Sequence, residues 1–339
     1  MRDSICRVEA SSRPPTWRKV IPLIGGFLFN LTFGSIYTFG NLSLYVTSYM
    51  RWAGDENVRI KNFSWVYTVS SLGLMIFFGG MLQEWIGIRR CAVLGAVLFS
   101  LSVTLSSWTV CSLPWFTLTF GILFGLADGL SYSCPIAAAY KWWPNKRGLV
   151  TGIVLAGTSM SALVFGPLQS LLVNPENKLP TSCPYSEFPK ELYFQDHEIL
   201  ERVPWIFFIL GIIFFVISLS SALSMGDPPI DDEIRSPFLP HNSQHETPKR
   251  PLAHNQLNVS PSQLIFHKEF WILWFILMLH GQFIIYLSLL WKIIGLSEVG
   301  ISDKHLSLVG NVLISVANTS GRLAWGSFAD YISVRALLR

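Results

Sequence analysis

The sequence predicts an all-α membrane protein with about eight transmembrane helices. Of its 339 residues, 51% are hydrophobic and only 14% are charged, whereas soluble domains carry about 25% charged residues. Several apolar stretches reach the roughly 20 residues that a helix needs to cross a bilayer. An open chain satisfies its backbone groups in lipid only as helix. The expected spans are residues 20–47, 63–82, 91–111, 115–140, 148–172, 204–225, 269–291 and 305–329.

The distribution of Lys and Arg predicts that the N-terminal segment, residues 1–19, is cytoplasmic. With this orientation, about twice as many basic residues fall in cytoplasmic segments as in outer ones, which is the bias that orients membrane proteins. The stretch after residue 19 is too long for a signal peptide, so we expect it to be the first span. We expect a multi-pass protein of the plasma membrane rather than of an organelle.

A polar segment divides the spans into two groups. Residues 226–267 are rich in Pro, Ser, Asn and His and have few large apolar residues. That composition cannot form a core and is typical of a flexible linker. The expected domains are a six-helix bundle over residues 20–225 and a partial second bundle of two helices over residues 268–339.

Small residues recur at helical spacing around the turn between the fourth and fifth spans. Gly121, Gly125 and Gly129 are four residues apart, and Gly148 and Gly152 repeat the pattern on the next helix. Such rows let helix backbones approach closely in lipid. Tight packing is the simpler interpretation, and sliding of these faces past each other is the alternative.

An internal repeat relates the ends of the second and eighth spans. Both copies carry glycine, acid, isoleucine and arginine in the same register, and both lie at the expected cytoplasmic end of a helix. Many transporters consist of two related halves with the binding site between them. We expect these residues to form a conformational latch, in which the acid pairs with basic residues or caps a neighbouring helix. They are Gly80, Glu84, Arg89, Arg90, Gly326, Asp330 and Arg335.

The repeat resembles the signature loop of the major facilitator superfamily. Within it, the chain is similar to the oxalate/formate antiporter and monocarboxylate transporter branch. The stretches that carry this similarity are GGFLFNLTFGSIYTFGNL, KWWPNKRGLVTGIVLAG, GQFIIYLSLLWK and ANTSGRLAWGSFAD. The resemblance implies a major facilitator fold, of which this chain supplies the N-terminal bundle and the first two helices of the C-terminal bundle. We therefore expect the chain to be C-terminally incomplete.

Arg322 is the strongest candidate for binding a substrate, because a charge inside a membrane helix usually faces a cavity or a partner. Its guanidinium is a planar fork that matches a carboxylate. In monocarboxylate transporters the arginine of the eighth span binds the substrate anion, and Arg322 in SGRLAWG matches it. The alternatives are snorkelling, or an ion pair with Asp330, although eight residues of helix separate the two by about 12 Å.

Four further polar residues are candidates for the substrate cavity. Tyr37 resembles the aromatic residue that lines the cavity in the oxalate/formate branch, and a packing role is the alternative. Asn30 and Asn41 lie on nearly one face of the first span, three turns apart. Asn318 precedes Arg322 by one helical turn. For each asparagine alone, a hydrogen bond between helices is the simpler interpretation.

Two titratable residues inside spans are candidates for coupling transport to protons. Asp128 lies in the middle of the fourth span, where desolvation would favour the neutral acid and allow it to carry a proton. His280 lies well inside the seventh span, and histidine titrates near neutral pH. A packing and hydrogen-bonding role is the simpler interpretation of His280.

The sequence contains none of the motifs GxSxG, HExxH, Walker loop or dinucleotide fingerprint. We therefore expect no enzyme, no cofactor, no metal site and no nucleic-acid partner. The predicted function is secondary active transport of small monocarboxylates, of the pyruvate/lactate or oxalate/formate type, by proton symport or as an antiporter that exchanges anions. The expected partners are a small carboxylate anion, protons and the lipid bilayer. The alternative is a non-transporting remnant that acts as a regulatory or scaffolding membrane subunit.

Overall fold

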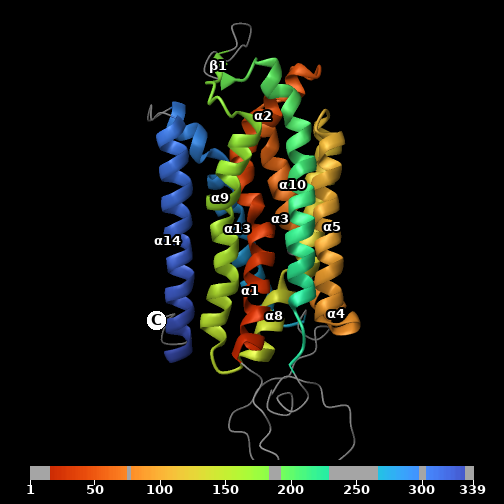
Figure 1. Ribbon diagram of the computed structural model, residues 1–339, viewed down its shortest axis with the longest axis vertical. Coiled ribbons are helices and arrows are strands. Elements are labelled where there is room, and N and C mark those ends of the chain that lie inside the picture. Colours follow the sequence, from red (N-terminus) through yellow and green to blue (C-terminus); the bar gives the residue numbers. More distant parts are fainter. Residues whose placement is uncertain (1–15, 75–77, 183–191, 229–265, 298–302, 333–339) are drawn as a thin grey trace, which may run out of the picture.

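The computed structural model describes residues 16–74, 78–182, 192–228, 266–297 and 303–332. These residues are nearly all helical, and the long helices run side by side along the longest axis of the molecule (Figure 1). The predicted all-α membrane fold is confirmed. The predicted linker lies mostly outside the described residues, so the division into two bundles stays a prediction.

The first predicted span is one long rod that tightens in its middle. It consists of α1 (Thr16–Phe33), the 3₁₀ segment η1 (Gly34–Thr38) and α2 (Phe39–Trp52). The second corresponds to α3 (Phe63–Leu74) and α4 (Phe78–Ile86), preceded by η2 (Ile60–Asn62), and the third to α5 (Ile88–Thr109). Gly87 joins α4 to α5 with φ of 87°, a left-handed conformation that glycine adopts without a steric penalty.

The remaining predicted spans also correspond to helices. The fourth is α6 (Leu113–Phe116), η3 (Thr117–Leu123), α7 (Phe124–Ser131) and α8 (Ser133–Trp142), and Pro144 lies in the turn that follows. The fifth to eighth are α9 (Arg147–Val173), α10 (His197–Ser224), α13 (Lys268–Ser297) and α14 (Asp303–Tyr331). Within the described part of the chain, 5 helical stretches are long and apolar enough to cross a membrane: 17–52, 88–109, 113–142, 147–173 and 197–224.

Aromatic side chains fill the space between the first six spans. Phe39 of α2 stacks on Phe120 of η3 with ring centroids 4.8 Å apart, and Phe33 of α1 stacks on Phe99 of α5 at 4.1 Å. All four rings are buried. Offset-stacked rings stabilise such contacts beyond the area that they bury, so this cluster fixes how α1, α2 and α5 sit around η3.

Among the described residues, the most extensive contact between two helices joins α9 to α14, which lie next to each other in Figure 1. A Cβ atom added to Gly148 would collide with the backbone oxygen of Gly326, and one added to Gly152 would meet the backbone of Arg322. The small row that begins at Gly148 is therefore a packing surface, as the sequence predicted. Gly125 of α7 lies in the same way against the backbone of Ser70 on α3.

The loop before α10 is held by a charged cap. It contains a short antiparallel pair, β1 (Thr181–Ser182) and β2 (Leu192–Tyr193). Asp196 accepts a hydrogen bond from the backbone N–H of Glu198 and so caps α10, and its other oxygen lies 2.6 Å from Lys178 Nζ. The hydrogen bond from Lys178 holds the pKa of Asp196 below its usual value. This ion pair joins the loop to the first turn of α10.

We predict that acid loosens the first turn of α10. Because the folded state lowers the pKa of Asp196, its contribution to stability is present above the unfolded value of about 3.9 and is lost as the pH falls through the lower folded value. Hydrogen exchange at residues 197–200, corrected for intrinsic rates, should rise over that range. Asp196→Asn should raise exchange already at neutral pH, whereas Glu176→Gln should change it little. Equal protection in all three proteins would contradict this account.

Candidate functional site

Several helices surround a cavity of about 90 Å³. Four of the predicted site residues line it: Arg322 from α14, Tyr37 from η1, Asn30 from α1 and Asp128 from α7. The walls also include Phe33, Ile36, Ser70, Ser71, Phe124, Tyr132 and Thr158. The fold thus brings together residues that lie almost 300 positions apart in the chain, and it mixes apolar walls with one cation and one acid.

A hydrogen bond at Nε holds one edge of the Arg322 guanidinium. Its Nε donates a hydrogen bond to Asn318 Oδ1 at 2.8 Å, and Ser159 Oγ of α9 donates to the same oxygen at 2.9 Å. No ion pair joins Arg322 to any residue that the structure describes. An arginine has five N–H donors, so the two terminal nitrogens remain available to a ligand. Asn318 itself is not among the residues that line the cavity.

The other two predicted asparagines, Asn30 and Asn41, lie in different surroundings. Asn30 lines the cavity, where its Nδ2 donates to Gly26 O at 3.1 Å and its Oδ1 accepts from Thr158 Oγ1 at 3.3 Å. Asn41 is buried on α2, where it donates to Ser170 Oγ of α9 at 3.0 Å. It is not among the residues that line the cavity. The sequence predicted both on nearly one face of the first span. In the structure only Asn30 reaches the cavity, and Asn41 lies farther along the span against α9.

Asp128 lies in the cavity wall without a bonded partner. It is partly buried, and no hydrogen bond or ion pair joins its carboxyl group to the described residues. Tyr37 and Tyr132 lie within electrostatic reach of both Asp128 and Arg322. The other proton-coupling candidate, His280, is exposed on α13 and does not line the cavity.

The acid of the second repeat caps a helix. Asp330 accepts hydrogen bonds from the backbone N–H groups of Gly148, at 2.7 Å, and Leu149, at 2.8 Å. These donors belong to the first turn of α9, where the helix leaves its N–H groups unpaired and presents positive potential. Asp330 therefore binds the end of α9, and no ion pair between it and Arg322 is present.

The first copy of the repeat, at the end of α4, caps no helix in the described part of the chain. Glu84, Arg89 and Arg90 are exposed, and none forms a hydrogen bond or an ion pair with a described residue. Gly80 has open space beside it, whereas Gly326 lies directly against α9. Arg335 lies outside the described residues. The two copies of the repeat thus occupy different environments.

Sequence reasoning did not single out the hydroxyl residues of the site. Ser71 lines the cavity and accepts a hydrogen bond from Gln282 of α13, and Thr158 and Ser159 contact two of the predicted asparagines. Serine and threonine are frequent in these spans, and their hydroxyls commonly bond to the preceding helical turn, so the residue type alone does not mark a site. Only position distinguishes them: Thr158 and Ser159 contact α1 and α14 from α9, and Ser71 contacts α13 from α3.

Comparison with known proteins places the chain in a family of transporters. The family model described as Major Facilitator Superfamily matches residues 23–339. Apicoplast pyruvate carrier 1 of Toxoplasma gondii is 28% identical over 95% of this chain and 69% of its own length. Apicoplast pyruvate carrier 2 of the same organism is 23% identical over 84% of this chain and 52% of its own length. Monocarboxylate transporter 12 of Xenopus laevis is 25% identical over 39% of this chain and 28% of its own length.

We predict that Asp330 and Glu84, the matching acids of the two repeats, differ in their effect on stability. Asp330→Ala removes the cap of α9 and should lower the free energy of unfolding by about 1 kcal/mol, which is typical of a lost helix cap. Hydrogen exchange at residues 148–150 should rise with it. Glu84→Ala removes no described contact and should change neither quantity. A Glu84→Ala effect as large as that of Asp330→Ala would contradict the assignment.

Proposed function

The chain belongs to the major facilitator superfamily, and we propose that it is a secondary active transporter of small monocarboxylates. The observation that carries the proposal is a half-buried guanidinium, Arg322, at the wall of a closed-in cavity between α14 and the first six spans. A fixed cation in a low-dielectric cavity attracts an anion strongly. The names of the similar proteins, pyruvate carriers and monocarboxylate transporters, agree with this substrate class.

The geometry of Arg322 favours a carboxylate as the ligand. Asn318 occupies Nε and so fixes the plane of the guanidinium, and the two terminal nitrogens can donate to both oxygens of a carboxylate. We propose that Asn318 and Ser159 act on the substrate through Arg322 and not by direct contact. Asn30 and Tyr37 offer an amide and a hydroxyl for a second polar group of the substrate.

The size and walls of the cavity favour a small substrate. Its volume of about 90 Å³ is well below the roughly 300–1,000 Å³ of sites for drug-sized ligands. Phe33, Ile36 and Phe124 provide apolar walls that would accept a methyl group. Lactate and pyruvate combine one carboxylate, one further oxygen and one methyl group, so they fit this combination better than oxalate does.

We further propose that the anion moves together with a proton carried by Asp128. With Arg322 and Asp128 both charged, the cavity is neutral, and a bound monoanion would add an uncompensated negative charge at high cost inside the membrane. Protonation of Asp128 restores neutrality. The other groups that face Asp128 across the cavity are Tyr37 of η1, Tyr132 beside α7 and the hydroxyls of α3, which are neutral near pH 7.

The cap of α9 by Asp330 suggests how one state of the cycle is stabilised. The contact joins the fifth span to the eighth, which belong to the two predicted halves. We propose that it forms in one state and breaks in the other, as alternating access requires. The cytoplasmic N-terminus and the plasma membrane remain the location that we propose.

We predict that Arg322→Ala abolishes saturable uptake of labelled pyruvate and lactate into proteoliposomes. One hydrogen bond to a charged group is worth about 1.5–3 kcal/mol, so substrate affinity should fall at least about tenfold. Arg322→Lys keeps the charge but loses the planar fork, so its substrate affinity should lie between those of the wild type and Arg322→Ala.

The control is Arg202→Ala, which removes a partly exposed arginine of α10 that lies near Glu198 and outside the cavity. It should transport like the wild type. If Arg322→Ala keeps the wild-type affinity, the carboxylate assignment is wrong. If folded wild-type protein takes up none of pyruvate, lactate, oxalate and formate, the alternative of a non-transporting subunit is favoured.

We predict that Asp128→Asn uncouples uptake from the proton gradient. The amide cannot carry a proton, so an inward proton gradient should no longer drive pyruvate accumulation, whereas exchange of internal for external pyruvate should continue. Glu201→Gln, an exposed acid of α10, should keep the wild-type response. Gradient-driven accumulation that is unchanged in Asp128→Asn would exclude this residue as the proton carrier.

A further inference from the structure

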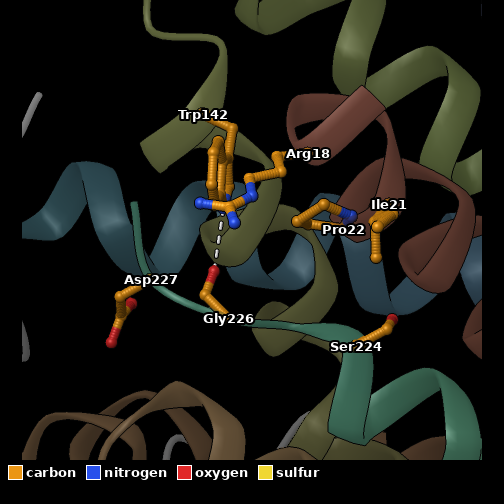
Figure 2. Close-up of a pocket in the computed structure, with 7 residues that line it drawn as sticks. All are labelled: Arg18, Ile21, Pro22, Trp142, Ser224, Gly226 and Asp227. Atoms are coloured by element: carbon orange, nitrogen blue, oxygen red, sulfur yellow. Dashed lines mark hydrogen bonds between the residues drawn. The ribbon is translucent and has the colours of Figure 1, made fainter. Parts of the chain in front are cut away.

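A second pocket lies at the opposite end of the molecule from the strands β1 and β2 (Figure 1). It has a volume of about 210 Å³ and lies where α1 begins and where α8 and α10 end. Its lining residues include Arg18, Ile21 and Pro22 of α1, Trp142 of α8 and Ser224 of α10 (Figure 2). The Arg18 side chain reaches toward the indole ring of Trp142 in this view.

Among the described residues, the polar groups of this pocket leave one charge without an ion pair. Asp227 is neutralised by Lys141, whose Nζ lies 2.6 Å from its carboxylate, and the carbonyl of Gly226 accepts a hydrogen bond of 2.8 Å from Trp142 Nε1. Arg18 forms no ion pair with the residues that the structure describes, and its Cζ lies 5.3 Å from the centroid of the Trp17 ring. The pocket therefore offers a guanidinium to an anion.

The surroundings of the pocket are apolar. Trp17, Ile21 and Ile24 lie four and three residues apart and so share one face of α1, and they are 58%, 41% and 53% exposed. On α10, Leu223 and Val216 are also exposed large apolar residues. In a membrane span such exposed faces contact hydrocarbon. The cation thus lies at the end of an apolar surface, and a ligand that fits both is an anion with hydrocarbon chains.

We propose that this pocket binds the phosphate group of an anionic phospholipid. Arg18 would contact the phosphate oxygens, since a guanidinium matches phosphate geometry. The indole of Trp142 would lie at the level of the headgroup, where tryptophan is enriched in membrane proteins. The acyl chains would lie along the apolar face of α1. Basic pockets between spans are sites of this kind, and a lipid here would tie the start of α1 to the ends of α8 and α10.

The test is lipid retention by the full chain in native mass spectrometry. Purified protein is titrated with phosphatidylglycerol, with phosphatidylcholine of the same chains, and with glycerol 3-phosphate. Wild-type protein should retain one phosphatidylglycerol in preference to phosphatidylcholine. Arg18→Ala should weaken this binding about fivefold, the contribution of one cation near an anionic lipid, and Arg18→Lys should retain most of it.

The matched control is Lys268→Ala, which removes an exposed cation from the start of α13 and lies outside the pocket. It should keep the wild-type preference for phosphatidylglycerol. Three results would overturn the proposal: equal retention of both lipids by the wild type, an unchanged preference in Arg18→Ala, or binding of glycerol 3-phosphate as tight as that of the lipid. The last result would assign the pocket to a soluble phosphate.

Discussion

The close crossing of α9 and α14 is the contact on which the site depends. It exists because glycine stands at Gly148 and Gly152 of α9 and at Gly326 of α14, where any larger side chain would meet backbone atoms. In a bilayer no hydrophobic drive holds helices together, so van der Waals contact between smooth faces has to do so. The two hydrogen bonds from the first turn of α9 to Asp330 add a directional lock at one end of the same interface.

This crossing also sets the position of Arg322. Gly152 lies against the backbone of that residue, so α14 sits close enough for Ser159 to reach Asn318 one turn away. Asn318 in turn holds Nε of Arg322. A charged side chain on a helix that was merely near the cavity could adopt many rotamers, each at a different depth. Here packing of the backbone and one shared amide oxygen restrict it, and restricted geometry is what makes a cation selective for a planar anion.

Sequence patterns predicted the helices and the principal charges more completely than the contacts between them. Apolar length gave the spans, and the rarity of charge inside them singled out Arg322 and Asp128, which do line one cavity. The asparagines could not be separated in the same way. Spacing places Asn30 and Asn41 on one face, but only the packing of α9 decides that one meets the cavity and the other meets Ser170. His280 illustrates the same limit, because nothing in α13 alone indicates which face is exposed.

Arg322 and Asp128 lie in one cavity without contacting each other, and this separation has a physical consequence. Both line one cavity, yet no ion pair joins them in the described part of the chain. A direct pair inside the membrane would be costly to break, because breaking it leaves two buried charges without compensation, and a substrate anion would have to break it before binding. Separated charges avoid that barrier while keeping the empty cavity neutral overall. Under the proposed function, the arginine then stays open to an anion and the acid stays open to a proton, so each group can bind its partner without displacing the other.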